Sequence, residues 1–306
     1  MKRRDFIRQS SLAGLILSTG VWPSNFLSAQ NELVKLTILH TNDWHSRIEP
    51  FGPNDGRNAN MGGAVRRANL IQSIRDQEES VLLLDSGDIF QGTPYFNYFK
   101  GELEFKIMSQ MKYDFATIGN HDFDAGLEGL ARQLPLADFT FLSANYDFED
   151  TLLAGKIRNH AVIRKNGIRI GVFGLGIQLE GLVPGDLYGK TRYMDPATVA
   201  RQTAYYLKHE QNCDLVICLS HLGYRYSGSK IDDRKLAANS TGIDLILGGH
   251  THTFMKEPEV VKNTDGRDVI INQVGWAGLL LGRLDLFLDQ SSGQICFDCK
   301  NIEIRS

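Results

Sequence analysis

The sequence is poor in cysteine, in net charge and in long apolar runs, and each shortage excludes a class of protein. Four cysteines in 306 residues are too few for a scaffold held by disulfides. A net charge of −3, with no long basic run, provides no surface of the kind that binds a nucleic-acid polymer. The apolar N-terminal stretch Ser11–Trp22 is too short for a stable membrane anchor. Hydrophobic residues still make up 42% of the chain, enough for one large core.

One cysteine pair, Cys296-x-x-Cys299, has the spacing of a redox or zinc motif, but it lies in a stretch of alternating β pattern. In a strand, residues three apart point to opposite faces. We therefore interpret these two cysteines, together with Cys213 and Cys218, as core or edge thiols.

The N-terminus has the layout of an export signal. The basic segment Lys2–Arg8 is followed by the apolar stretch Ser11–Trp22 and by a small-residue cleavage site near Ala29. Its Arg-Arg-x-Phe-Ile core resembles the twin-arginine export signal. No cysteine lies near the cleavage site, which argues against a lipoprotein. We expect a signal peptide over residues 1–29, a mature catalytic domain over 30–306 and a periplasmic location; the alternative is a basic, disordered tail.

After this segment, apolar runs alternate with amphipathic ones, a pattern typical of an α/β fold. The fully apolar run Val81–Leu84 is typical of a strand buried on both faces, and Asn166-Gly167 between two apolar runs predicts a β-hairpin. Helices are expected at 64–77, 104–111, 127–134 and 197–211, and strands at 34–40, 81–84, 115–118, 139–144, 162–164, 168–175, 214–220, 243–247 and over most of 257–304. We expect a single domain with two sheets packed together and helices outside.

Five short polar motifs follow predicted strands, and each contains side chains that bind metals. They are Asp43-Trp44-His45, Gly87-Asp88, Gly119-Asn120-His121-Asp122, His221, and Gly248-Gly249-His250-Thr251-His252. Each alone has an ordinary explanation, because an aspartate after a strand often caps a helix and a lone histidine is often a hydrogen-bonded structural residue. Together, and in this order, they indicate a metal centre.

The candidate ligands are enough for two metal ions. On an extended backbone, residues i and i+2 point the same way, which pairs Asp43 with His45 and His250 with His252. The two oxygens of Asp88 allow that carboxylate to bridge two ions, the arrangement used for displacement at phosphorus. The predicted ligands are Asp43, His45, Asp88, Asn120, His221, His250 and His252. This mixture of carboxylate, amide and imidazole fits Zn, Mn, Fe or Co.

His121 lies beside a candidate ligand but need not bind metal itself. Asp124 follows three residues later, a spacing that indicates a histidine whose tautomer and basicity are set by a carboxylate. We therefore predict that His121 and Asp124 are catalytic residues.

From Leu36 to about Leu286, the chain resembles the metallophosphoesterase domain of the 5′-nucleotidase family, within the calcineurin-like superfamily. The resemblance rests on the motifs above and on Leu39–His45, Asp85–Pro94, Ser143-Ala144-Asn145, Ser220–Gly223 and Leu281–Leu284. It implies a four-layer α/β/β/α sandwich, in which a metal-bridging hydroxide attacks a phosphomonoester of nucleotide type. It implies one metal held by Asp43, His45, Asp88 and His252 and another by Asp88, Asn120, His221 and His250.

The resemblance also implies that His121, oriented by Asp124, stabilises the transition state or the leaving group. One departure is Asp122, which stands where family members often carry glutamate. The other is that full-length members carry a C-terminal nucleoside-binding domain, for which a chain ending at Ser306 leaves no room. We therefore expect either a stand-alone phosphoesterase or the catalytic half of a split nucleotidase whose nucleotide-binding half is a separate chain.

Three alternatives remain on the same scaffold. A sulfur-ester hydrolase of the thiosulfohydrolase type and a cyclic-nucleotide hydrolase would use the same ligands. The third alternative, from another class, is a non-catalytic metal-binding or interaction protein. The complete set of ligands argues against it, because a protein that had lost catalysis would have no reason to keep them all.

Overall fold

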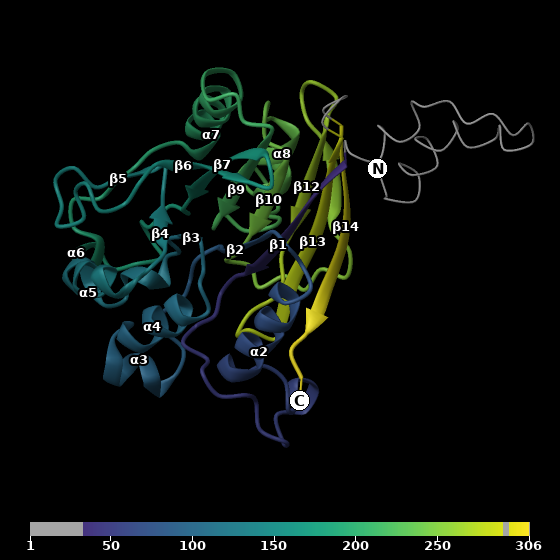
Figure 1. The fold of residues 1–306 in the computed structure, drawn as a ribbon. Helices are drawn as coiled ribbons and strands as arrows, with labels where there is room; N and C mark the ends of the chain where they lie inside the picture. Colours follow the sequence, from purple (N-terminus) through teal and green to yellow (C-terminus); the bar gives the residue numbers. More distant parts are fainter. Residues whose placement is uncertain (1–32, 290–293, 306) are drawn as a thin grey trace, which may run out of the picture.

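The computed structural model describes residues 33–289 and 294–305, which form two six-stranded sheets with helices outside them (Figure 1). The predicted signal peptide lies outside these residues. In spatial order, the first sheet contains β14 (Ile295–Glu303), β13 (Leu280–Asp289), β1 (Leu33–Thr41), β2 (Val81–Asp85), β3 (Phe115–Thr117) and β4 (Thr140–Leu142). Its strands β1 to β4 run parallel, and β13 and β14 extend the sheet by antiparallel pairing.

The second sheet contains β11 (Glu259–Lys262), β12 (Asp268–Asn272), β10 (Leu245–Gly248), β9 (Leu215–Ser220), β7 (Ile168–Leu175) and β6 (His160–Lys165). Its four inner strands are parallel, and the two edge strands are antiparallel to their neighbours. A small ribbon pairs β5 (Tyr146–Asp147) with β8 (Arg192–Tyr193). All the parallel strands of each sheet therefore end at one edge.

Helices cover the outer face of each sheet. The helices are α2 (Ala64–Arg75), α3 (Pro94–Phe99), α4 (Glu102–Gln110), α5 (Gly126–Gln133), α6 (Gly185–Tyr188), α7 (Pro196–Tyr205) and α8 (Asp233–Ala238), with short 3₁₀ turns at Gly56–Asn58, His121–Phe123 and Leu134–Leu136. A π-helical turn, Tyr206–Glu210, extends α7. None of the described helices is both long enough and apolar enough to cross a bilayer.

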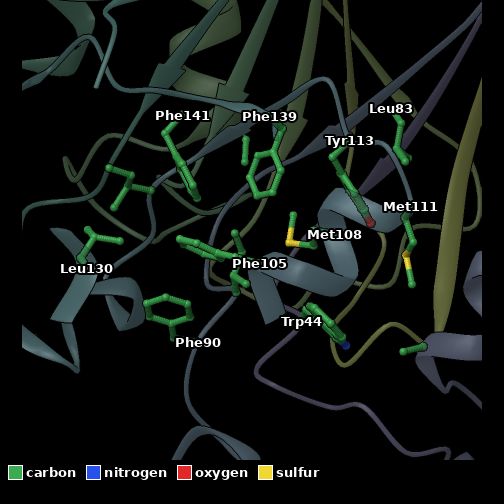
Figure 2. Close-up of a cluster of buried hydrophobic side chains, with 14 of the residues drawn as sticks. Trp44, Leu83, Phe90, Phe105, Met108, Met111, Tyr113, Leu130, Phe139 and Phe141 are labelled. Atoms are coloured by element: carbon green, nitrogen blue, oxygen red, sulfur yellow. The ribbon is translucent and has the colours of Figure 1, made fainter. Parts of the chain in front are cut away.

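Three apolar clusters hold the layers together. One lies between the sheets, where Ile38 and Leu84 of the first sheet pack with Ile217 of the second. Another lies between the first sheet and its helices, where Phe105 on α4 packs against Phe141 with ring centroids 5.0 Å apart (Figure 2). A third joins the second sheet to α7 and α8. Burial of this apolar area is the main stabilising term, and the layers confirm the predicted four-layer α/β/β/α fold.

The predicted elements agree with these boundaries to within a few residues, and the hairpin turn is confirmed by left-handed φ values of 48° at Asn166 and 78° at Gly167. Strand β14 carries Cys296 and Cys299 on opposite faces, as the alternation predicts. Three short helices, α3, α6 and α8, were not expected. Helix α3 begins with a proline in its first turn, and α8 is capped by the Asp232 side chain, so local end signals define both.

Candidate metal centre

The predicted ligands come together at the edge where the parallel strands of both sheets end. Asp43 and His45 follow β1, Asp88 follows β2, and Asn120 follows β3. From the second sheet, His221 follows β9, and His250 and His252 follow β10. Loops beyond the carboxyl ends of parallel strands are where α/β folds place their binding residues. The site therefore depends on the two sheets being packed against each other.

The ligand atoms form two groups, and within each group all of them lie within 4.8 Å of one another. The first group is Asp43, His45 and His252, and the second is Asp88, His221 and His250. In the first group, the Nε2 atoms of His45 and His252 are 2.9 Å apart. Beside the second group, Asn120 Oδ1 lies 2.8 Å from His250 Nδ1.

Asp88 lies between the two groups. Its Oδ2 is 3.1 Å from His221 Nε2 and 3.9 Å from His45 Nε2, so one carboxylate faces an imidazole of each group. Its Oδ1 accepts a hydrogen bond from the backbone N–H of His121 at 2.8 Å. The loop that follows β3 thereby holds the Asp88 side chain in place.

The ligand loops are not extended, which corrects one step of the sequence argument. Asp43, His45, Asp88, His250 and His252 all adopt left-handed backbone, with φ of 51°, 52°, 55°, 70° and 50°. Side chains at i and i+2 therefore converge through tight left-handed turns rather than through the alternation of a strand. Such backbone costs roughly 1–3 kcal/mol at a non-glycine residue and clusters at functional sites.

Two glycines allow these loops to meet. At Gly87, where φ is 86°, an added Cβ would lie 2.6 Å from the backbone nitrogen of Gly119. At Gly119, an added Cβ would lie 2.2 Å from Oδ1 of Asp88. A side chain at Gly119 would therefore displace the Asp88 carboxylate, and a side chain at Gly87 would push apart the loops that follow β2 and β3.

Hydrogen bonds direct two imidazoles into the site. His221 Nδ1 lies 2.7 Å from the Ser86 carbonyl oxygen, and His45 Nδ1 lies 3.3 Å from that of Phe90. Because a carbonyl only accepts, each Nδ1 carries a proton, which leaves Nε2 of each ring as the nitrogen that faces the centre. This is the usual way in which a protein orients metal-binding histidines.

Electrostatics also fit divalent cations. Burial alone would disfavour a charged Asp88, but the neighbouring His221 holds the pKa of that carboxyl below its usual range. Burial likewise opposes protonation of His221, but Asp88 raises its pKa to about 10. The pair thus holds a proton between ligand atoms, where a metal ion would replace it. Burial lowers the pKa of His250 to about 4, so that imidazole is neutral, as a ligand must be.

His121 and Asp124 stand at the mouth of the centre. The His121 ring lies edge-on to His45, with centroids 5.3 Å apart, and its side chain is 37% exposed. Its Nδ1 donates to Asp124 Oδ2 at 2.8 Å, which raises the pKa of His121 above its ordinary value. Nε2 is therefore the atom of this ring that is available to a bound molecule.

Sequence reasoning missed the supporting role of Asp122, although the motif contained it. The buried Asp122 carboxylate accepts backbone N–H groups from both loops: Oδ2 from Gly119 at 2.8 Å and Asp88 at 3.1 Å, and Oδ1 from Ile89 at 2.9 Å and Phe90 at 3.1 Å. Asn42 was also missed. Its amide donates to Asp43 Oδ2 and to the Gly275 carbonyl, both at 2.6 Å.

Asp122→Asn is expected to lower the free energy of unfolding by about 2–4 kcal/mol, because the new amide N–H₂ would face backbone donors. The divalent-metal affinity should fall by roughly 10–100-fold, as it does when other supporting groups of metal sites are lost. Denaturant unfolding and metal titration measure the two effects. The matched control is Asp244→Asn, because Asp244 accepts a single backbone N–H, from Val216 at 2.7 Å, at the other end of β9 and β10. Equal metal affinity in both variants would contradict this role.

Comparison with known proteins matches residues 36–254 to the calcineurin-like phosphoesterase family. The chain is 32% identical to snake venom 5′-nucleotidase of Crotalus adamanteus over 92% of its own length and 50% of that protein's length. It is also 32% identical to human 5′-nucleotidase, over 85% of the chain and 48% of the relative.

The crystal structure of the 5′-nucleotidase precursor from Thermus thermophilus shares the fold with a TM-score of 0.80 and 32% identity, over 88% of this chain and 54% of that one. The chain thus spans about half the length of each of these three relatives.

Proposed function

Because this chain belongs to the calcineurin-like phosphoesterase family, we propose that it hydrolyses phosphomonoesters of nucleotide type at a two-metal centre. The observation that carries the proposal is the pair of ligand groups, Asp43–His45–His252 and Asp88–His221–His250, with Asp88 between them.

We propose that Asp43, His45, Asp88 and His252 hold one divalent ion and that Asp88, Asn120, His221 and His250 hold the other. Two such ions supply Lewis acidity and a reactive solvent nucleophile when bound. The chain itself positions these ligands. Contacts with backbone carbonyl groups orient the imidazoles, and the left-handed loops bring ligands from both sheets to one point.

We propose that His121 acts at the leaving oxygen. With Nδ1 bonded to Asp124, a protonated ring presents Nε2–H, which can donate to the phosphate or to the departing oxygen. The orientation by Asp124 and the exposure of the ring at the mouth of the centre support this role.

Nucleotides are the proposed substrate class because relatives that match most of this chain are named 5′-nucleotidases. The chain corresponds to about half of each. A separate nucleotide-binding chain would supply further nucleoside contacts and should raise kcat/KM for nucleotides selectively.

A hydrolysis screen of the metal-analysed protein tests the proposal. The panel comprises AMP, GMP, UMP, an aryl phosphate, a cyclic nucleotide and an S-sulfonate ester. We expect phosphomonoesters to be cleaved, with little difference among the three bases, since contacts to phosphate alone do not distinguish nucleosides. Cleavage of the sulfur ester or the cyclic nucleotide alone would replace the proposal with that activity. No hydrolysis by the loaded protein would favour a binding role.

We also propose export through the twin-arginine route, with residues 1–29 as signal and 30–306 as the catalytic domain. Replacing Arg3 and Arg4 by lysine keeps the charge but removes the arginine pair that defines the twin-arginine signal. The precursor is therefore expected to stay in the cytoplasm, as measured by fractionation and immunoblotting. Lys2→Arg is the matched control, and unchanged delivery of the double-lysine variant would exclude this route.

A further inference from the structure

Arg67 on α2 is a buried cation that the proposed chemistry does not use. It is 1% exposed, and among the described residues only Trp44 is a larger fully buried side chain. Its nitrogens Nε and Nη2 have no hydrogen-bond partner among the described residues. Arginine is almost never fully buried unless it is paired, so this guanidinium needs a contact that compensates for its loss of water.

The compensating contact is the indole ring of Trp44. The Cζ atom of Arg67 lies over that ring, 4.1 Å from its centroid. Tryptophan provides the most favourable ring face for a cation, and the attraction is stronger where water is excluded. Trp44 is itself 1% exposed and belongs to the apolar cluster shown in Figure 2. Arg67 therefore covers one face of a fully buried ring.

Other contacts hold the edge of the Trp44 ring. Its Nε1 donates to the Arg47 carbonyl oxygen at 2.6 Å. A Cβ added at Gly278 would lie 3.7 Å from Trp44 Cδ1, so the loop that precedes β13 packs against the indole. The N–H of Ala277 in the same loop donates to the Asp43 carbonyl oxygen at 2.7 Å. The ring is thus enclosed by α2 and by that loop.

Trp44 lies between two proposed ligands of the first group. Asp43 and His45 both adopt left-handed backbone, with φ of 51° and 52°. Residues with a side chain keep this conformation only where the surrounding structure enforces it. An indole fixed between the two ligands enforces it, because moving the ring would rotate the backbone on either side. The relative placement of the Asp43 carboxylate and the His45 imidazole therefore depends on Trp44.

A different explanation for the burial of Arg67 is charge compensation of Asp85. Burial raises the pKa of the Asp85 carboxyl to about 7, and the positive charge of Arg67 opposes that rise. The Asp85 oxygens accept from Thr41 Oγ1 at 2.6 Å and from the Gly87 N–H at 2.9 Å. The guanidinium, in contrast, lies over the indole. The two explanations predict different effects of Arg67→Lys, which keeps the charge but not the planar group.

We infer that Arg67 is a positioning residue for the first ligand group: stacked on Trp44, it holds the Asp43–Trp44–His45 turn in the geometry that binds a divalent ion. The inference rests on the proposed function in one respect, the binding of an ion by this group. It adds a residue on α2 that controls one of the two ions and touches neither ion nor substrate.

The test is a calorimetric titration of the chelator-treated protein with Mn²⁺. Arg67→Met should weaken one of the two ions by roughly 10–100-fold, the range for loss of a group that supports metal ligands, and leave the other unchanged. Arg67→Lys should weaken the same ion by about 5-fold or more, because a lysine does not replace a stacked guanidinium. If Arg67→Met fails to fold, Arg67→Lys and Trp44→Leu test the same expectation.

The matched control is Ile74→Ala, which removes a buried apolar side chain of α2 roughly 10 Å further along the helix. This variant should lower the midpoint of denaturant unfolding and leave both Mn²⁺ affinities unchanged. A loss of Mn²⁺ affinity in Ile74→Ala as large as in Arg67→Met would show that the effect follows from general destabilisation, and would overturn the inference.

Two further comparisons show which group and which contact are involved. In the His252→Ala protein, which lacks a ligand of the first group, adding Arg67→Met should not change the affinity of the remaining ion. In the Trp44→Leu protein, adding Arg67→Met should cause little further loss, since both changes remove the same contact. Additive losses in the double variant would show that Arg67 does not act through Trp44.

These outcomes are separate from those of the proposed function. Selective loss of the first ion in Arg67→Met, in a protein that binds two Mn²⁺ ions but hydrolyses no phosphomonoester, would retain the inference and overturn the proposed activity. Equal weakening of both ions, unchanged binding in Arg67→Met, or full Mn²⁺ affinity in Arg67→Lys would overturn the inference, whatever the protein hydrolyses.

Discussion

The Asp88→Ala variant is expected to be isolated with neither metal ion and to lose more than roughly 10³-fold in kcat/KM for phosphomonoesters. The reason is position, because the carboxylate faces His221 at 3.1 Å and His45 at 3.9 Å and so serves both ligand groups. Loss of one electrostatic group at a reacting centre already costs about 10²–10³, and this substitution removes a ligand of two ions. Metal content by mass spectrometry and steady-state kinetics measure the two outcomes. Chelation of the unsubstituted protein should reproduce the kinetic loss.

The control for Asp88 is His252→Ala, which removes a ligand from the first group only. That variant should keep about one equivalent of metal, bound by Asp88, His221 and His250. Two equivalents per chain in Asp88→Ala would show that Asp88 does not bridge. Loss of both ions in His252→Ala would show instead that the two sites fill only together.

The second large effect is expected at His121. His121→Ala should keep two metal equivalents and lower kcat by roughly 10²–10⁴, the range for a positioned acid–base group. The ring has no place in either ligand group, but its Nδ1 is held by Asp124 at 2.8 Å and its side chain reaches the mouth of the centre. Metal analysis and single-turnover kinetics separate the two readouts.

The Asp124→Asn variant tests the orienting role of Asp124 by comparison with His121→Ala. An asparagine still accepts the Nδ1–H hydrogen bond but no longer stabilises the imidazolium, so the loss in kcat should be smaller than in His121→Ala. If His121→Ala emptied the centre, His121 would be a ligand or a structural support. If Asp124→Asn cost as much as His121→Ala, the two residues would act as one unit.

The location of the site was predictable because of a property of α/β sheets. Parallel strands end at a common edge, so polar motifs after apolar runs such as Val81–Leu84 had to lie along that edge. Helices and strands in the long periodic segments were predictable for a different reason, because burial of one or both faces produces a regular spacing of apolar residues in the sequence. Short elements such as α3 and the ribbon of β5 and β8 have no such period and were missed.

The supporting contacts were not predictable. Asp122 is an ordinary acidic residue in the sequence, and only the approach of the β2 and β3 loops turns its carboxylate into the acceptor of four backbone N–H groups. Likewise, the convergence of Asp43 with His45 was expected for the wrong physical reason. A positive φ depends on the packing around a residue, and residue type alone does not reveal it at an aspartate or a histidine.

By itself, the sequence determined the chemistry that this protein brings to one edge of an α/β fold: carboxylate, amide and imidazole side chains, each following a strand. That information is local, because an apolar run and the polar residue after it are neighbours in the chain. Only the tertiary structure decided how those side chains divide into two groups. That division depends on the packing of one sheet against the other, which joins residues such as Asp88 and His221 that are far apart in the chain.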